Sequence, residues 1–118
     1  MNATFARLVN ERNLEALLEL YEPSAVVRID AEHTFQGTTE IETALRDLLK
    51  VPGTMNAVNH FCLEQGDIAL LRADYAMAGE DGSRLLVGSP AEIVRRGEDG
   101  GWRYVIDHAA GSSLPPQI

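Results

Sequence analysis

The feature that most constrains the fold is the stretch 92–108, which has the pattern of a β-hairpin. Strand-forming residues in Glu92–Arg96 and Trp102–Ile106 flank a turn cluster, Gly97–Gly101, in which glycine supplies positive φ at no steric cost. A hairpin this polar is not stable alone. The earlier part of the chain must therefore cover one of its faces.

Strand alternation sorts the side chains of the last strands into two faces. In the strand 102–108, Trp102, Tyr104, Ile106 and His108 are expected on one face, and Arg103, Val105 and Asp107 on the other. In the strand 68–78, the apolar face carries Ala69, Leu71, Ala73, Tyr75 and Met77, while Arg72 and Asp74 lie opposite. We expect the apolar faces to be the inner ones, and Asp107 to point outward.

The chain before the hairpin has helical patterns first and strand patterns afterwards. Apolar spacing predicts helices over Ala3–Arg12, Leu14–Tyr21 (capped by Asn13) and Thr39–Lys50, the last opened by a capping box at Thr39–Glu42. Strands are predicted at Ala25–Asp30, Thr34–Gln36, Met55–Gln65, Ile68–Ala78, Arg84–Arg96 and Trp102–His108, with a bend or bulge at Gly88 and Pro90.

This order predicts an α+β fold in one domain, 1–118, with a loose tail at 111–118. Short links between successive strands favour antiparallel pairing. A strongly curved antiparallel sheet closed by N-terminal helices forms a cone with an opening, which is a natural place for a small molecule.

Composition excludes several classes of partner. A formal net charge of −8 argues against nucleic acid and against an anionic membrane surface. No apolar run approaches the ~20 residues of a membrane span. The single Cys62 cannot form an intramolecular disulfide and is expected to be a small buried residue. Without a Cys/His cluster we expect neither a metal nor another cofactor, and a reducing cytoplasm is the expected location.

The order of elements and several short segments resemble the NTF2-like superfamily, in its SnoaL-like and ketosteroid-isomerase-like branch. These segments are Leu17–Tyr21, Ala25–Val27, Gly37–Ile41, Gly66–Leu70 and Asp99–His108. The closing segment is most similar to small bacterial proteins of the SgcJ/EcaC type. The resemblance implies the cone-shaped fold and a homodimer through the outer sheet face. Because this fold hosts isomerases, cyclases, dehydratases and non-catalytic binding modules, it does not fix the activity.

Ketosteroid isomerases use a carboxylate base, a tyrosine and a protonated aspartic acid. The resemblance places these positions at Arg28, Phe5 and Glu92, and only Glu92 keeps the chemical type. Asp30 lies two residues past Arg28, on the same strand face, and could replace the base. The match therefore does not favour steroid isomerisation.

The same resemblance implies that Glu92 lies inside the cone, where burial would raise its pKa and make it a general acid. An ion pair with Arg28, Arg95 or Arg103 is the alternative. His108 could act as an acid or base, or could be a strand-end histidine bonded to the backbone. The apolar neighbours Ala57, Phe61 and Leu63 place Asn59 inward. The predicted catalytic residues are Glu92, Asp30 and His108, and the predicted ligand contacts are Tyr75, Tyr104, Asn59 and Arg28.

We therefore expect an apolar pocket for a small apolar organic ligand, with cofactor-independent acid–base chemistry. The rival is a non-catalytic module that binds a ligand or a protein, and a further alternative is a dimer whose cavity is filled by its own side chains. A cavity that reaches Glu92 and His108 would favour the first two readings.

Overall fold

The computed structural model describes residues 1–30 and 32–112. Its helices are α1 (Asn2–Asn10), α2 (Leu14–Glu19) and α3 (Thr38–Leu49). Its strands are β1 (Tyr21–Arg28), β2 (Thr34–Gln36), β3 (Thr54–Gln65), β4 (Ile68–Ala78), β5 (Arg84–Gly88), β6 (Ala91–Arg96) and β7 (Trp102–His108). The order confirms the predicted α+β fold class.

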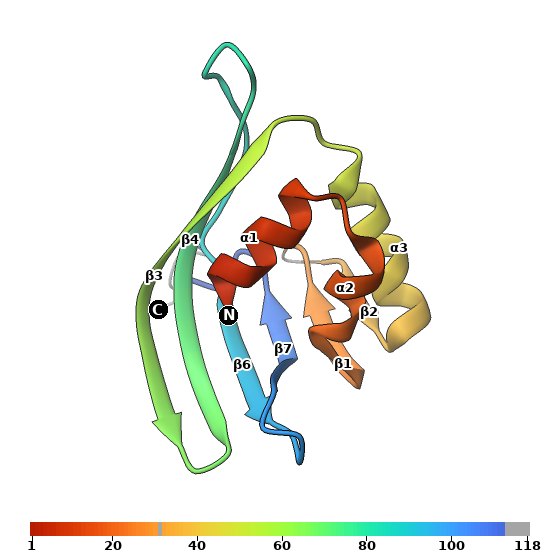
Figure 1. Cartoon of the computed structure of the whole chain (residues 1–118), viewed down its shortest axis with the longest axis vertical. Helices are drawn as coiled ribbons and strands as arrows, with labels where there is room; N and C mark the ends of the chain where they lie inside the picture. Colours follow the sequence, from red (N-terminus) through yellow and green to blue (C-terminus); the bar gives the residue numbers. More distant parts are fainter. Residues whose placement is uncertain (31, 113–118) are drawn as a thin grey trace.

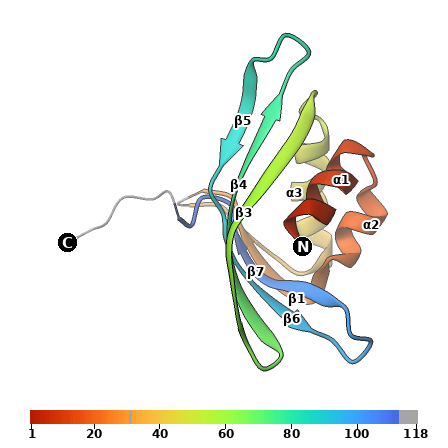
Figure 2. The same cartoon turned by 60° about the vertical axis from the view of Figure 1, so that its left-hand side comes forward.

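The strands form one strongly curved sheet in the order β2-β1-β7-β6-β4-β3, with β5 beside the end of β4 (Figure 1). All pairs are antiparallel except β1 and β7, which run parallel and make the sheet mixed rather than purely antiparallel. The helices lie on the concave face, and no described helix covers the convex face, here called the outer face (Figure 2).

The core lies between the helices and the concave face of the sheet. Its fully buried side chains come from every layer: Val9 of α1, Leu17 of α2, Ile41 of α3, Met77 of β4 and Tyr104 of β7. The Asn13 side chain accepts a hydrogen bond from the Ala16 backbone N–H and caps α2, as predicted. The apolar stripes of the helices therefore pack against the apolar concave face of the sheet to form this core.

Two helix ends differ from the prediction. The second helix ends at Glu19, so Tyr21 is the first residue of β1 and not part of a helix face. The third helix starts one residue before Thr39, with Gly37 as its N-cap at φ 83°, a conformation that glycine adopts without strain. The predicted capping box does not form; instead the Glu40 carboxylate accepts a hydrogen bond from the Gln36 N–H.

A β-bulge at Val105 reverses the predicted faces at the end of β7. Val94 pairs with Tyr104 and Ile93 pairs with Ile106, so Val105 is the extra residue. Asp107 is consequently buried on the inner face, whereas Ile106 is 44% exposed on the outer face. The prediction that Asp107 points outward, with Ile106 and His108 inward, is wrong because it assumed unbroken alternation.

A second bulge, at His60, does the same in β3. Asn59 pairs with Ala73, but Phe61 already pairs with Arg72. Phe61 and Leu63 therefore lie on the outer face, not inside as the apolar pattern suggested, and they are 40% and 61% exposed. Cys62, which pairs with Leu71, is also exposed, contrary to the prediction, and it borders a hollow rather than packed core.

None of the described helices is both long and apolar enough to cross a bilayer. Of the predicted loose tail, only Gly111 and Ser112 lie within the described residues. Ser112 donates hydrogen bonds from its N–H and its hydroxyl to the Ser89 carbonyl.

Candidate functional site

A cavity of about 370 Å³ lies between the concave sheet face and the helices. Its walls are mostly apolar side chains of α1, α3 and the strands β1, β3 and β4. The polar groups at its inner end are Asn2, Tyr21, Tyr75, Glu92 and Asp107, and the exposed residues Asp30, His33 and Asp47 mark its opening. An apolar cavity with a few convergent polar groups is the usual form of a small-molecule site.

Two carboxyl groups face this cavity side by side. Glu92 of β6 and Asp107 of β7 are directly opposite each other in the antiparallel pair, and they are only 4% and 9% exposed. Side chains at such positions have Cβ atoms about 4.5–5.5 Å apart. Because two adjacent carboxyls in an apolar environment cannot both be charged without a large cost, the pair is expected to retain a proton.

The pKa of each acid is raised, mainly by burial. Burial and then the charge of Asp107 raise the pKa of Glu92 to about 8, against smaller lowering effects of Asn2 and Tyr104. Burial raises the pKa of Asp107 to about 6, although its hydrogen bond with Tyr21 acts in the opposite direction. At neutral pH we therefore expect the pair to share one proton and one negative charge, and the stronger rise of the Glu92 pKa favours the proton on Glu92.

Hydrogen bonds from the surrounding elements hold this pair. The Tyr21 hydroxyl donates to Asp107 Oδ2 at 3.0 Å, and the Tyr104 hydroxyl donates to Asn2 Oδ1 at 3.0 Å. The Asn2 amide in turn donates to Asn59 Oδ1 at 2.9 Å. Glu92 Oε1 is different, because it is buried and has no hydrogen-bond partner among the described residues. A buried oxygen without a partner is costly, and a ligand could satisfy it.

The opening of the cavity carries a different kind of acid. Asp30 accepts hydrogen bonds from the backbone N–H groups of Glu32 and His33, and its carboxylate lies 2.8 Å from His33 Nδ1. These contacts lower the pKa of Asp30 to about 2. The Asp30 side chain is therefore an exposed, ionised group at the opening rather than a buried acid.

The structure brings only some of the predicted site residues together. Glu92, Asp30 and Tyr75 line the cavity. Tyr104 is fully buried behind its wall, and burial raises the Tyr75 pKa as well as that of Tyr104.

The other predicted residues lie outside the cavity lining. Asn59 borders a separate hollow beside Cys62 and Trp102. His108 is on the opposite strand face from Asp107, and its Nδ1 accepts a hydrogen bond from the Ala110 N–H. The Arg28 guanidinium donates from Nε to Thr34 Oγ1. The cavity therefore reaches Glu92 but not His108.

Three polar residues of the site were not predicted from the sequence: Asp107, Tyr21 and Asn2. Alternation assigned Asp107 to the wrong face, and helical spacing assigned Tyr21 to a helix. No sequence signal marks Asn2, whose role depends on where α1 crosses the sheet. Among the described residues, no cluster of His, Cys, Asp and Glu has the form of a metal site.

The model of the SnoaL-like domain family matches residues 2–105 of the chain. No curated protein matches the chain. Among solved structures, it is similar to an NTF2-like protein with a cystatin-like fold from Novosphingobium aromaticivorans (22% identity, TM-score 0.72, covering 94% of this chain and 79% of that one). It is also similar to a ketosteroid isomerase-like protein from Erwinia carotovora (13% identity, TM-score 0.71, covering 91% and 87%).

A third similar structure, from Thiobacillus denitrificans, is named for the association domain of calcium/calmodulin-dependent protein kinase type II (16% identity, TM-score 0.78, covering 98% and 92%). At these identities the likenesses show the fold, which is the predicted NTF2-like one, and not the activity. The family model, in contrast, covers most of the chain. The protein with this buried carboxyl pair is a member of the SnoaL-like domain family.

Proposed function

We propose that the chain binds a small, largely apolar organic molecule in the cavity and exchanges a proton with it through Glu92 and Asp107. The observation that carries this proposal is the unpartnered Glu92 Oε1, buried opposite Asp107 at the inner end of an apolar cavity. The apolar walls would bind the body of the ligand. The carboxyl pair would bind its polar end.

The two acids have different roles because their pKa values differ. Protonated Glu92 can donate a proton to the ligand, and ionised Asp107 can accept one. The two events together leave one proton on the pair, and transfer from Asp107 back to Glu92 restores the starting state. No cofactor is needed for this exchange. Tyr75, which lines the cavity, would orient the ligand.

The methionine methyl groups offer a direct test of the binding site. Met55 lines the cavity, Met1 borders the separate hollow, and Met77 is fully buried in the core. In a protein with labelled methionine methyl groups, the neutral cage compound 2-adamantanone should shift the Met55 signal most, that of its cross-strand partner Met77 less, and leave the Met1 signal in place.

Substitutions on α3 provide a matched control for this experiment. Ala44 lines the cavity, whereas its neighbour Thr43 is exposed. Ala44→Trp should fill the cavity and abolish the shift of the Met55 signal, and Thr43→Trp should preserve it. An unchanged Met55 signal in the wild-type protein would reject this ketone as a ligand, and an equal shift in Ala44→Trp would reject the cavity as its binding site.

We also propose that a second copy of the chain covers the outer face. Leu63, Leu70, Ile93 and Ile106 are successive cross-strand partners, so they form one apolar row across β3, β4, β6 and β7. Leu63, Leu70 and Ile106 are 61%, 43% and 44% exposed in the single chain. A contiguous apolar row of this kind on a sheet face supports a self-complementary interface.

A further inference from the structure

The cavity contains acidic groups without a matching cation. Its charged lining residues are Asp30, Asp47, Glu92, Asp107 and His33. Asp30 is paired with His33 and Asp47 with Lys50, so the acids in question are the buried pair, Glu92 and Asp107. Among the described residues that line the cavity, none is Lys or Arg. A buried carboxylate needs a counter-charge or a full set of hydrogen bonds to offset its loss of solvation. Among the described residues, the lining therefore offers no Lys or Arg to balance the charge of this pair.

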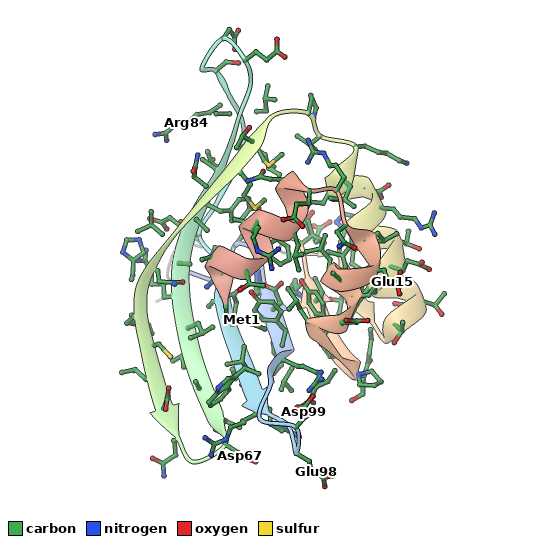
Figure 3. All side chains as sticks on the ribbon, viewed as in Figure 1. Met1, Glu15, Asp67, Arg84, Glu98 and Asp99 are labelled. Carbon is green, nitrogen blue, oxygen red and sulfur yellow. The ribbon has the colours of Figure 1, made fainter. Side chains whose placement is uncertain are left out.

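Among the described groups that face Glu92, the positive one is the Met1 amino group, and its influence there is weak. From β7 come Asp107 and Tyr104, from β1 comes Tyr21, and from α1 come Asn2 and the Met1 amino group (Met1 is labelled in Figure 3). The Met1 amino group has the smallest of the effects on the Glu92 pKa. Glu92 Oε1 remains without a partner.

We infer that the ligand of this cavity is a hydrophobic amine, whose protonated nitrogen donates hydrogen bonds to Glu92 Oε1 and to the Asp107 carboxylate while its hydrocarbon body fills the apolar part. This inference rests on the proposed function, because it names the ligand class of the same cavity. It adds the sign of the ligand's charge, which the proposed function leaves open.

A neutral carbonyl compound is the competing ligand class, since its oxygen could accept the Glu92 proton. The position of Asp107 decides between the two. A carbonyl oxygen brought to Glu92 would lie beside the Asp107 negative charge, which repels it, whereas an ammonium group there is attracted by that charge and can also donate to Glu92 Oε1.

The two classes differ in their pH dependence. An ammonium group binds better to ionised Glu92, so amine affinity should rise as pH increases through the Glu92 pKa of about 8. A carbonyl compound needs the Glu92 proton, so its affinity should fall over the same range. The amine itself stays protonated there, since an alkylamine resembles a lysine side chain with a pKa of about 10.4.

The test compares 2-adamantylamine with 2-adamantanone, which share one hydrocarbon cage. Binding is followed by the Met55 methyl signal between about pH 6.5 and about pH 8.5, where we expect the amine affinity to rise about tenfold and to exceed that of the ketone by about tenfold or more. At about pH 8.5, Glu92→Gln and, separately, Asp107→Asn should each weaken the amine about tenfold, and neither should weaken the ketone by more than about twofold.

The outcomes separate the inference from the proposed function. Ketone binding that equals or exceeds amine binding, or amine affinity that falls with rising pH, would overturn the amine inference and leave the cavity as a small-molecule site. A Met55 signal that neither compound shifts would overturn both. Amine binding that persists in Ala44→Trp would mean attachment to the acidic surface and would also overturn the inference.

Discussion

Glu92 and Asp107 are directly opposed across the β6–β7 pair, and both point into the cavity. Tyr104 and Asp107 both face inward although they are three residues apart, a spacing that in a regular strand would put them on opposite faces. The bulge at Val105 makes this possible, because one extra residue restores Asp107 to the inner face. The site therefore depends on a local irregularity of the backbone. Without the bulge Asp107 would face outward and Glu92 would be a lone acid.

The first prediction concerns the titration of the carboxyl pair. Carboxyl-carbon NMR should show steps near pH 6 and near pH 8, assigned mainly to Asp107 and Glu92. Asp107→Asn should lower the Glu92 pKa, because the Asp107 charge is the second largest cause of its rise, but burial should keep it above the ordinary value of 4.5.

The converse substitution should have a smaller effect. Glu92→Gln should leave the Asp107 pKa near 6, since burial is its main cause and Glu92 is already neutral when Asp107 titrates. Tyr21→Phe should raise the Asp107 pKa, because it removes a hydrogen bond that favours the charged form. If Asp107→Asn changed the Glu92 pKa by the same amount as Glu92→Gln changed the Asp107 pKa, this assignment would be contradicted.

The second prediction concerns stability. The folded-state pKa of Glu92, about 8, lies above its ordinary value of 4.5. The preference of the folded protein for neutral Glu92 therefore contributes fully to stability below pH 4.5, and this contribution is lost as pH rises through the folded-state pKa of about 8. Glu92→Gln removes the titration, so the variant should gain roughly 1–3 kcal/mol of unfolding free energy relative to wild type between about pH 5 and about pH 9.

Denaturant titrations at the two pH values measure this difference. Glu98, exposed at the hairpin turn and labelled in Figure 3, provides the control. Glu98→Gln should differ from wild type by the same amount at both pH values. A Glu92→Gln protein that is clearly less stable than wild type at neutral pH would instead indicate a charged Glu92 in an ion pair.

The sequence predicted the elements of this fold well, because regular periodicity carries most of the information. The inner face of β4, from Ala69 to Met77, follows strict alternation, whereas the inward position of Glu92 was predicted from the family resemblance. The parallel pairing of β1 with β7 could not be predicted in this way. It joins strands at opposite ends of the chain, and only the closing of the curved sheet brings them together.

The candidate site was predicted less completely, since it depends on where the periodicity fails. The bulges at His60 and Val105 carry no glycine, so the sequence gives no sign of them. The first moved Phe61 and Leu63 to the outer face, and the second moved Asp107 inward. Asn2 and Tyr21 reach the site from elements distant in sequence, so only tertiary packing reveals their role.

The third prediction tests the proposed dimer. Leu70 lies within the apolar row of the outer face and is 43% exposed in the single chain. Leu70→Glu should therefore preserve the fold but convert the dimer into a monomer, because a charge at the centre of an apolar interface loses its solvation. Thr43→Glu introduces the same charge on exposed α3 and should remain dimeric. Light scattering that shows wild-type monomers at micromolar concentration would reject the interface.

The fourth prediction concerns the wall of the cavity at Tyr75. The Tyr75 ring lies directly over Gly88 of the neighbouring β5, so a Cβ atom at Gly88 would overlap the ring. Gly88→Ala should displace Tyr75 into the cavity, cost roughly 1–3 kcal/mol of stability, and weaken binding of 2-adamantanone at Met55. The matched control is Gly79→Ala, where the nearest atoms to a new Cβ are side-chain oxygens at 3.3 Å that can move. Equal melting temperatures and equal affinities for 2-adamantanone in the two variants would contradict the position of the Tyr75 ring over Gly88.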